Sequence, residues 1–146
     1  MQIEIKIDSA CKIPKVVIMT DSMTEEVNDI MKKLSEDAPK VITGFQEDVA
    51  EILEPATISR FYASNGKVYA DTNKGEFLVR VRLYEIEDQL CLPDFVRISN
   101  SEIINLKKVK NFDLSFTGTI CVTLLDGTVT YVSRRYVSKI KKILGI

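Results

Sequence analysis

The chain has 146 residues, of which 45% are hydrophobic and 28% charged, and its formal net charge is −1. This composition is typical of a globular protein with a core and excludes a disordered chain. Because no apolar run approaches the ~20 residues of a membrane-spanning helix, and the N-terminus does not resemble a secretory signal, we expect a soluble, cytoplasmic protein.

The residue inventory argues against an enzyme. The chain has no histidine, which is the most common general base and metal ligand. Cys11, Cys91 and Cys121 lie far apart without a CxxC pair, so we expect three buried apolar side chains and neither disulfides nor zinc. No glycine-rich phosphate loop or G-x-S-x-G motif is present. We therefore expect no catalytic residue, no cofactor, no metal and no small-molecule substrate.

Two strands are predicted near the N-terminus. Ile3, Ile5 and Ile7 alternate with polar residues, which predicts a half-buried strand over residues 2–7. The sequence KVVIMT at residues 15–20 predicts a second, more buried strand.

A helix is predicted over about residues 23–36, with Ser22 and Glu25 as a capping box and residues 37–39 as its end. Its apolar stripe consists of Val27, Ile30, Met31 and Leu34. The stripe suits packing against the neighbouring strands, and the alternative is a partner-binding face. Residues 1–44 thus form a predicted β-α extension.

From residue 40 onward, short strands alternate with turn signals, a pattern typical of a mostly β domain, and we assign this domain to residues 45–146. Strands are predicted over residues 57–63, 67–71, 76–80, 95–99, 108–116, 119–125 and 128–133. Strong turns are expected at Ser64-Asn65-Gly66 and Asp126-Gly127. A short helix is predicted over residues 83–90, and a compact turn or short helical segment over residues 100–106. A terminal helix is predicted over residues 134–144, with Gly145 as its C-cap.

Polar residues are concentrated where these turns should present them. Lys67 follows the first turn, Asn100 and Ser101 follow the strand that carries Arg97, and three polar residues mark the start of the last helix. Those three are Ser133, Arg134 and Arg135.

The start of the last helix is the most informative of these places. Ser133 can cap the helix, whose N-terminus carries roughly half a positive charge. Arg134 and Arg135 add positive charge where acids are usually preferred. Such a helix start suits phosphate or base contacts, and the alternative is two surface arginines with no specific role.

Charge is unevenly distributed along the chain. Residues 1–44 carry 6 basic and 8 acidic residues, whereas residues 45–146 carry 14 and 13. Within the second part, Lys107, Lys108 and Lys110 form one basic cluster, and residues 134–142 form another without any acid. Local basic patches matter more than net charge for contacts to phosphates.

The ordered set of motifs from residue 45 to residue 146 resembles a LytTR domain. It comprises ISRFYASNGKVYADTNKGEF (58–77), RLYEIEDQL (82–90), FVRISNSEIINLKKV (95–109) and DGTVTYVSRRYVSKIKKIL (126–144). The third motif is similar to the F-x-R-I-H-x-S-x-x-V-N-x-x-x-I pattern of many members. The resemblance covers about 100 residues in the same order.

The resemblance implies a stack of small antiparallel sheets with short helices, a mostly β (α+β) fold. It also implies a transcriptional regulator that inserts loops into successive major grooves of duplex DNA, at paired direct repeats, as a homodimer. The residues implied in DNA binding are Asn65, Lys67, Arg97, Asn100, Ser101, Ser133, Arg134 and Arg135. Arginine can read guanine and asparagine adenine, whereas Lys67, Ser101 and the lysines of residues 107–110 suit phosphates.

The chain departs from the family pattern in two respects. Many members have histidine where Ser99 stands and a basic residue where Asn100 stands, so the target sequence cannot be transferred from relatives. Many members also follow a phosphorylatable receiver domain, for which residues 1–44 are too short. The chain instead resembles stand-alone regulators with a short extension, which are often restrained by a small membrane protein.

Two hypotheses from different classes remain at this point. The first is a sequence-specific regulator that binds double-stranded DNA. The second is a protein–protein adaptor without DNA binding, in which the predicted N-terminal helix is the docking face. The extension could serve dimerisation, contact a partner, or cover a sheet edge.

Overall fold

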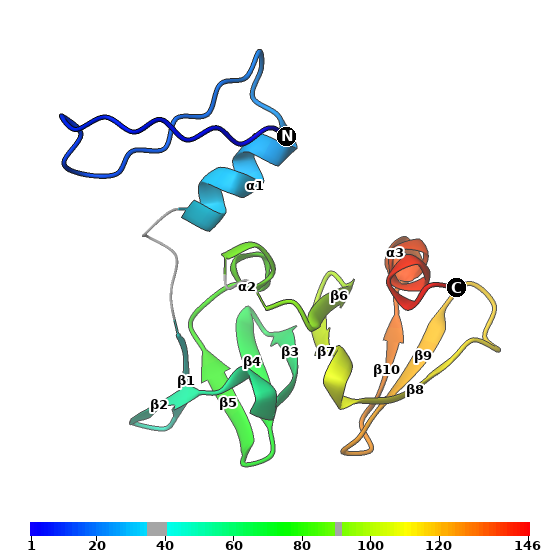
Figure 1. The fold of residues 1–146 in the computed structure, drawn as a ribbon. Coiled ribbons are helices and arrows are strands. Elements are labelled where there is room, and N and C mark those ends of the chain that lie inside the picture. The colour runs from blue at the N-terminus through cyan, green and yellow to red at the C-terminus, as the bar shows by residue number, and fades with distance from the viewer. Residues whose placement is uncertain (35–40, 90–91) are drawn as a thin grey trace.

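The computed structural model describes residues 1–34, 41–89 and 92–146 (Figure 1). The helices are α1 (Glu25–Leu34), α2 (Leu83–Gln89) and α3 (Arg134–Leu144), with short 3-10 helices η1 (Pro55–Thr57) and η2 (Leu106–Lys108). The strands are β1 (Ile42–Gln46), β2 (Val49–Leu53), β3 (Ile58–Ser64), β4 (Lys67–Thr72), β5 (Gly75–Val79), β6 (Phe95–Ser99), β7 (Glu102–Asn105), β8 (Val109–Asp113), β9 (Ile120–Leu124) and β10 (Val129–Val132).

The strands form two antiparallel sheets. The larger sheet has the order β2-β1-β5-β4-β3-β7-β6, and the smaller has the order β10-β9-β8. Figure 1 shows the two sheets next to each other, with α2 beside the larger and α3 beside the smaller. The predicted fold class, a mostly β protein built from small antiparallel sheets with short helices, is confirmed.

The buried apolar side chains of the described residues form two cores. Phe61 and Phe77 are buried with Ile86 of α2 in the first core, which lies on the larger sheet. The second core contains Ile98 of β6 and Ile140 of α3 together with apolar residues of the smaller sheet. Burial of a large apolar side chain stabilises a fold by about 1.5–3 kcal/mol, so these cores hold the connecting turns in fixed places.

Several predicted elements are confirmed. β6 has the predicted bounds, and β3 and β4 meet at the predicted turn. α3 covers residues 134–144, and Gly145 ends it in the left-handed conformation (φ 74°) while its N–H donates to the carbonyls of Lys141 and Lys142.

The prediction for residues 100–106 is wrong in part. A compact turn or helical segment was expected there, but residues 102–105 form β7, which pairs with both β3 and β6. All four residues of β7 are buried. A strand that is buried on both faces lacks the polar–apolar alternation by which strands are recognised.

The predicted strands at residues 2–7 and 15–20 are also wrong. Neither segment is a strand, and the isoleucines of the first segment are almost fully exposed. Alternation of apolar and polar residues gives a segment one apolar face, but a strand also needs a neighbouring strand to pair with.

α1 begins later than predicted. The Thr24 hydroxyl oxygen accepts a hydrogen bond from the Val27 N–H (3.3 Å), so Thr24 caps the helix and the expected Ser22–Glu25 capping box is not formed. Val27 is buried, α1 packs against α2, and Lys32 pairs with Asp88 at 3.4 Å. The expected packing on N-terminal strands is therefore replaced by packing on α2. The predicted end at residues 37–39 lies outside the described residues.

The two described cysteines differ in burial. Cys121 is buried as expected, whereas Cys11 is exposed, contrary to the prediction, and Cys91 lies outside the described residues. Among the described helices, none has the length and apolar character needed to span a membrane.

Candidate nucleic-acid interface

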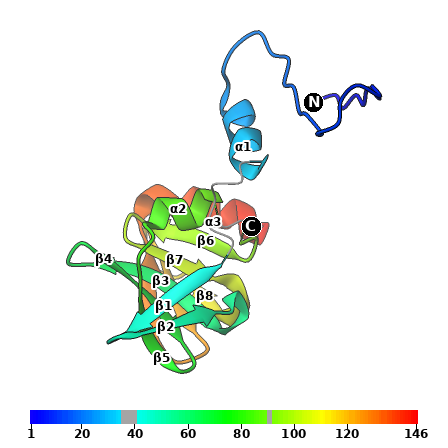
Figure 2. The same ribbon diagram turned by 90° about the vertical axis from the view of Figure 1, so that its left-hand side faces the viewer.

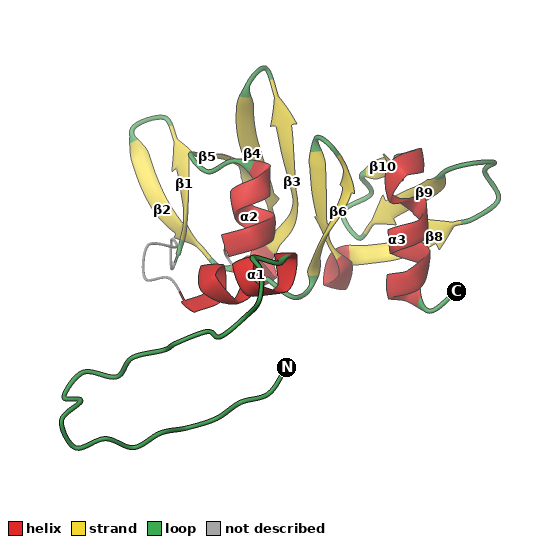
Figure 3. Ribbon diagram, turned by 90° about the horizontal axis from the view of Figure 1, so that it is seen from above, coloured by secondary structure: helices red, strands yellow, loops and turns green. Residues whose placement is uncertain are grey.

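Three of the predicted segments meet along one edge of the molecule. The Ser101 carbonyl accepts a hydrogen bond from the Ala63 N–H (2.8 Å), which joins the β6–β7 turn to the end of β3. The Ser133 N–H donates to the Ile98 carbonyl (2.9 Å), which joins the start of α3 to β6. Figures 2 and 3 both show the β3–β4 turn, the β6–β7 turn and the start of α3 on the same side of the molecule. We call these three segments the reading edge.

The first segment is a tight hairpin turn. Asn65 (φ 53°) and Gly66 (φ 75°) both have positive φ, the conformation that a two-residue type I′ turn requires and that Asn-Gly favours. Asn65 and Lys67 are exposed at its tip. The backbone geometry therefore presents an amide and an ammonium group to solvent.

The second segment is the β6–β7 turn, which carries Asn100 and Ser101 in exposed positions. The Ser99 hydroxyl oxygen accepts a hydrogen bond from the Ser101 N–H (3.2 Å). Tyr136 of α3 donates its hydroxyl to Asn100 Oδ1 (3.4 Å), which ties this turn to the third segment. The amide nitrogen of Asn100 keeps its donors for an external acceptor.

Arg97 lies behind this turn rather than on the surface. Its side chain is only 13% exposed. Nε donates to the Ser99 carbonyl (2.7 Å) and Nη2 to the Asn100 carbonyl (2.6 Å), while Glu87 of α2 pairs with Nη1 at 3.8 Å. The guanidinium group thus holds the backbone of the turn from inside.

The third segment is the junction between β10 and α3. Ser133 occupies the N-cap position, but its hydroxyl makes no capping hydrogen bond, contrary to the capping role that we expected. Arg134 and Arg135 are exposed, and no ion pair between described residues involves them. The first turn of α3 also contains no acidic residue. Two guanidinium groups and free backbone N–H groups at a helix start form a site suited to an anion.

A basic groove runs beside the first segment. It has a volume of about 480 Å³ and contains four basic side chains in its lining, Lys67, Arg80, Arg82 and Arg97. Arg80 also stacks over the Phe45 ring at 4.0 Å, which restricts its position. The sequence interpretation missed Arg80 and Arg82, although the alternation in VRVR (79–82) shows that both arginines lie on one face of an extended segment.

The basic cluster of Lys107, Lys108 and Lys110 lies away from the reading edge. Lys107 and Lys108 belong to η2, which follows the far end of β7, whereas Ser101 precedes the near end. Figure 3 shows η2 away from the reading edge. Lys107 also pairs with Asp94 at 3.6 Å. The structure therefore separates these lysines from the other candidate contacts.

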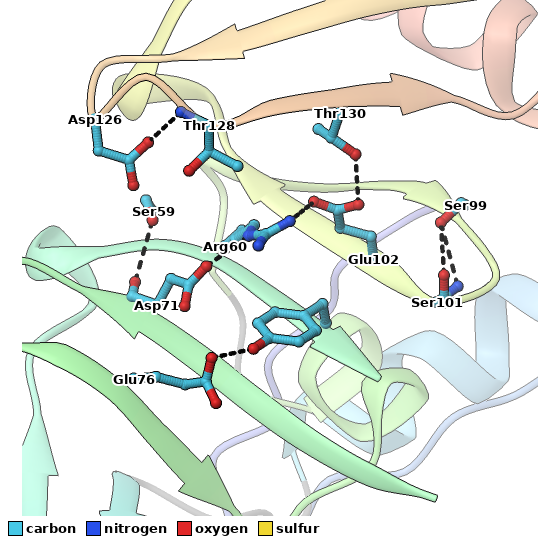
Figure 4. A network of polar contacts seen from close by, with 11 residues as sticks. Ser59, Arg60, Asp71, Glu76, Ser99, Ser101, Glu102, Asp126, Thr128 and Thr130 are labelled. Carbon is cyan, nitrogen blue, oxygen red and sulfur yellow. Dashed lines mark hydrogen bonds and ion pairs between the residues drawn. The ribbon is translucent and has the colours of Figure 1, made fainter. Parts of the chain in front are cut away.

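A network of charged groups connects the two sheets directly behind the reading edge (Figure 4). Arg60 of β3 donates to Asp71 of β4 (2.6 Å) and to Glu102 of β7 (3.0 Å). The hydroxyl of Thr130 of β10 donates to the second oxygen of Glu102 (2.6 Å). Glu102, the residue after Ser101, is thereby held from both sheets.

Burial and hydrogen bonds in this region shift the pKa values of Arg60 and Tyr62. Burial lowers the pKa of Arg60, but hydrogen bonds to Asp71 and Glu102 outweigh burial and raise that pKa above its usual value. Burial raises the pKa of the Tyr62 hydroxyl, and its hydrogen bond to Glu76 raises it further. Both groups are protonated at neutral pH with or without these shifts. The sequence interpretation missed this network, and its one signal was the acid Glu102 in an otherwise apolar strand.

Groups for metal or redox chemistry are scarce in the described part of the chain. No cluster of three or more metal-ligating side chains is found among those residues. The two described cysteines, Cys11 and Cys121, are unpaired. What the site offers is exposed amide, hydroxyl, ammonium and guanidinium groups on a rigid edge, which suits binding of an anionic polymer.

Comparison with known proteins adds three findings. The model of the family described as LytTr DNA-binding domain matches residues 49–145. Uncharacterized HTH-type transcriptional regulators of Staphylococcus aureus strains NCTC 8325 and MRSA252 are 34% and 33% identical over 133 residues, 91% of this chain and 86% of theirs. A solved LytTr DNA-binding domain from Bacillus cereus has a TM-score of 0.69 at 23% identity and covers 74% of this chain and 100% of that domain. At that identity, the structural likeness concerns the fold.

Proposed function

The chain belongs to the LytTr DNA-binding domain family, and we propose that it regulates transcription by reading duplex DNA with the three segments of the reading edge. The observation that carries the proposal is the contact series through Ala63, Ser101 and Tyr136, which brings turns distant in sequence to one edge. The model of the LytTr DNA-binding domain family matches residues 49–145, a span that contains all three segments, which supports the proposal.

The polar groups of the reading edge and the groove beside it divide into two roles. Arg134 and Arg135 suit bidentate contacts to guanine, and the amides of Asn65 and Asn100 suit adenine. Lys67, Ser101 and Ser133 suit contacts to phosphate or sugar, as do the groove arginines Arg80 and Arg82, and these contacts position the protein without specifying sequence. Arg97 acts as a positioning residue, because its guanidinium is occupied by backbone carbonyls.

The reading edge consists of turns and one helix start. Strands separate α1, α2 and α3 along the chain, so the described residues contain no pair of consecutive helices of the helix-turn-helix kind. We therefore propose loop insertion into successive major grooves, in the cytoplasm, with one chain on each of two direct repeats.

Partners beyond DNA follow from the family resemblance. A homodimer on paired repeats is the expected assembly. A small membrane protein that restrains the regulator is a second candidate partner, and co-purification from membranes of cells that express both proteins is the measurement for it.

The first experiment is selection of bound fragments from random duplex DNA, followed by binding of the selected sequences over a salt series. We expect two short repeats about one helical turn, roughly 10 base pairs, or slightly more apart. Affinity should fall steeply with salt, because phosphate contacts release counterions. If folded protein enriches no sequence at low salt, DNA reading is refuted and the adaptor function takes its place.

A further inference from the structure

Residues 2–8 form an extended segment with an uncovered apolar face. The side chains of Ile3, Ile5 and Ile7 are 87%, 84% and 96% exposed. Figures 2 and 3 show the N-terminal segment on the side of the molecule away from the reading edge. A partner on this segment therefore leaves the reading edge free.

The backbone of the same segment is also unpaired. Among the described residues, no hydrogen bond involves the N–H or carbonyl groups of residues 2–7. The first bonded group is the Asp8 carbonyl, which accepts from the Cys11 N–H (3.1 Å) at the turn that follows. An extended segment with free backbone groups and one apolar face is a template for pairing with another strand.

The charge pattern of the segment selects its partner. The sequence QIEIKID (2–8) is self-complementary when two copies pair antiparallel about Ile5. In that register Glu4 lies opposite Lys6 of the second copy, and Ile3 lies opposite Ile7. The remaining pair joins the Gln2 amide to the Asp8 carboxylate. Directly opposed pairs of this kind stabilise antiparallel strands.

Neighbouring registers are unfavourable. A two-fold axis at Glu4 would place two glutamates opposite each other, and an axis at Lys6 would place two lysines opposite each other and Glu4 opposite Asp8. Like charges directly opposed destabilise a strand pair. A shift by one residue would bring isoleucines opposite polar side chains and mix the two faces. Among these registers, the one centred on Ile5 pairs opposite charges and also places isoleucines opposite each other.

We propose that residues 2–8 pair with the same residues of a second copy of this chain, antiparallel and centred on Ile5. The pair places three isoleucines of each copy on one face, and an isologous two-fold contact is the commonest form of homodimer. A two-stranded ribbon alone is marginal. Val16, Val17 and Met19, which are exposed in residues 15–20, supply more apolar surface for the same assembly.

The relatives carry a matching region. Their 133 matched residues are more than the span 49–145 contains, so the match extends into residues 1–48. Most of residues 1–48 are therefore matched in these proteins. The proposal concerns assembly without DNA, and it is independent of the reading edge.

The test is the oligomeric state of the full chain by sedimentation equilibrium without DNA. The wild type should be a dimer. Glu4→Lys and Lys6→Glu should each weaken dimerisation roughly tenfold or more, since either change creates two like-charge pairs. The double variant Glu4→Lys/Lys6→Glu has the composition of the wild type and should recover the dimer.

Mixing the two single variants provides a sharper outcome. A Glu4→Lys chain and a Lys6→Glu chain are complementary to each other, so the mixture should form heterodimers that neither variant forms alone. Pairing within one chain, or with an unrelated protein, cannot produce this rescue. A monomeric wild type, single variants that dimerise normally, or a mixture without rescue would overturn the proposal. Selection of DNA by the same proteins reports separately on the reading edge.

Discussion

Arg134 and Arg135 stand at the positive end of α3, where an acidic residue would stabilise the helix and a cation does not. Their placement costs some helix stability, which a bound phosphate or guanine edge would offset. The cost is about 0.3–1 kcal/mol for each charge at an exposed helix end. Selection for a function at this junction explains such an arrangement better than selection for stability does.

Replacement of both arginines by alanine tests this role. Arg134→Ala/Arg135→Ala should weaken specific DNA binding about tenfold or more for each arginine, because each bidentate contact contributes roughly 1–3 kcal/mol. The thermal midpoint should be unchanged or slightly raised. Lys141→Ala/Lys142→Ala is the matched control, since it removes the same charge from the last turn of α3 and should change affinity much less. Equal losses in the two variants would mean that only net charge matters.

Arg97 illustrates a residue that acts through its neighbours. Arg97→Ala should lower the free energy of unfolding by about 2 kcal/mol, because the variant loses two charge-assisted hydrogen bonds to the turn. DNA affinity should fall, yet the slope of log affinity against log salt should stay as in the wild type. Loss of a residue that contacts phosphate would reduce the magnitude of that slope by about one. A lower slope in Arg97→Ala would therefore show direct contact with DNA.

At the scale of elements, hairpin turns and strand ends present the polar groups while the sheets hold them. β3, β7 and β6 are neighbours in the larger sheet, and the Arg60–Glu102–Thr130 contacts connect this sheet to β10. The spacing between the turns is thus set by strand pairing. A reading edge built in this way keeps its shape without a recognition helix.

The groove beside β5 extends the edge. Arg80→Ala/Arg82→Ala should weaken binding to all sequences by similar factors and lower the salt slope by about two, because phosphate contacts carry no sequence information. Lys107→Ala/Lys110→Ala removes the same charge near the other end of β7 and serves as the control. Titrations of one duplex at several salt concentrations decide between them. If the salt slope falls only in the control variant, the residues that contact the DNA phosphates lie on η2 and β8 instead.

The β9–β10 turn gives a prediction for pH. The hydrogen bond from the Thr128 N–H to the Asp126 carboxylate (2.9 Å) lowers the pKa of Asp126 below its usual value. A carboxylate whose pKa is lower in the folded state stabilises the fold above its unfolded pKa, and this stability is lost as the pH falls through the folded pKa. Asp126→Asn should retain the turn and show a smaller loss of stability between about pH 5 and pH 3. Denaturant unfolding of both proteins over that range checks this, and parallel curves would contradict it.

At the scale of the whole molecule, the reading edge and the N-terminal extension lie on different sides (Figures 2 and 3). This arrangement allows one chain to bind DNA and a second chain at the same time. Two chains joined through their extensions would bind paired repeats at a high effective concentration. Reading edges that followed the two-fold axis of the paired extensions would face inverted repeats. Selection of direct repeats would therefore show that the two reading edges do not follow that axis.

Joined extensions should make DNA binding cooperative. Glu4→Lys should weaken binding to a duplex with two repeats, whereas binding to a single repeat should stay within about twofold of the wild type, because the extension lies away from the reading edge. The double variant Glu4→Lys/Lys6→Glu should restore the two-repeat affinity. Titration of one-repeat and two-repeat duplexes measures both. An equal loss on the single repeat would contradict a role in assembly.

The sequence by itself determined the features that depend on a few adjacent residues. Asn65-Gly66 specifies its turn because Gly and Asn tolerate positive φ. Residues 134–144 specify α3 because their apolar stripe and the glycine after it satisfy a helix locally. The family could also be predicted, since the order of the motifs along the chain is a one-dimensional property.

Only the tertiary structure decided which of these features act together. β7 is buried on both faces, so its strand character depends on β3 and β6 and is invisible as a local pattern. Residues 2–7 have the pattern of a strand but pair with no strand in the described part of the chain. The sequence suggests that Arg97 is a surface cation. Only the fold of the β6–β7 turn shows that its guanidinium donates to the backbone carbonyls of Ser99 and Asn100. Pairing between distant segments depends on register and on the available neighbours, and neither is encoded in any short stretch of residues.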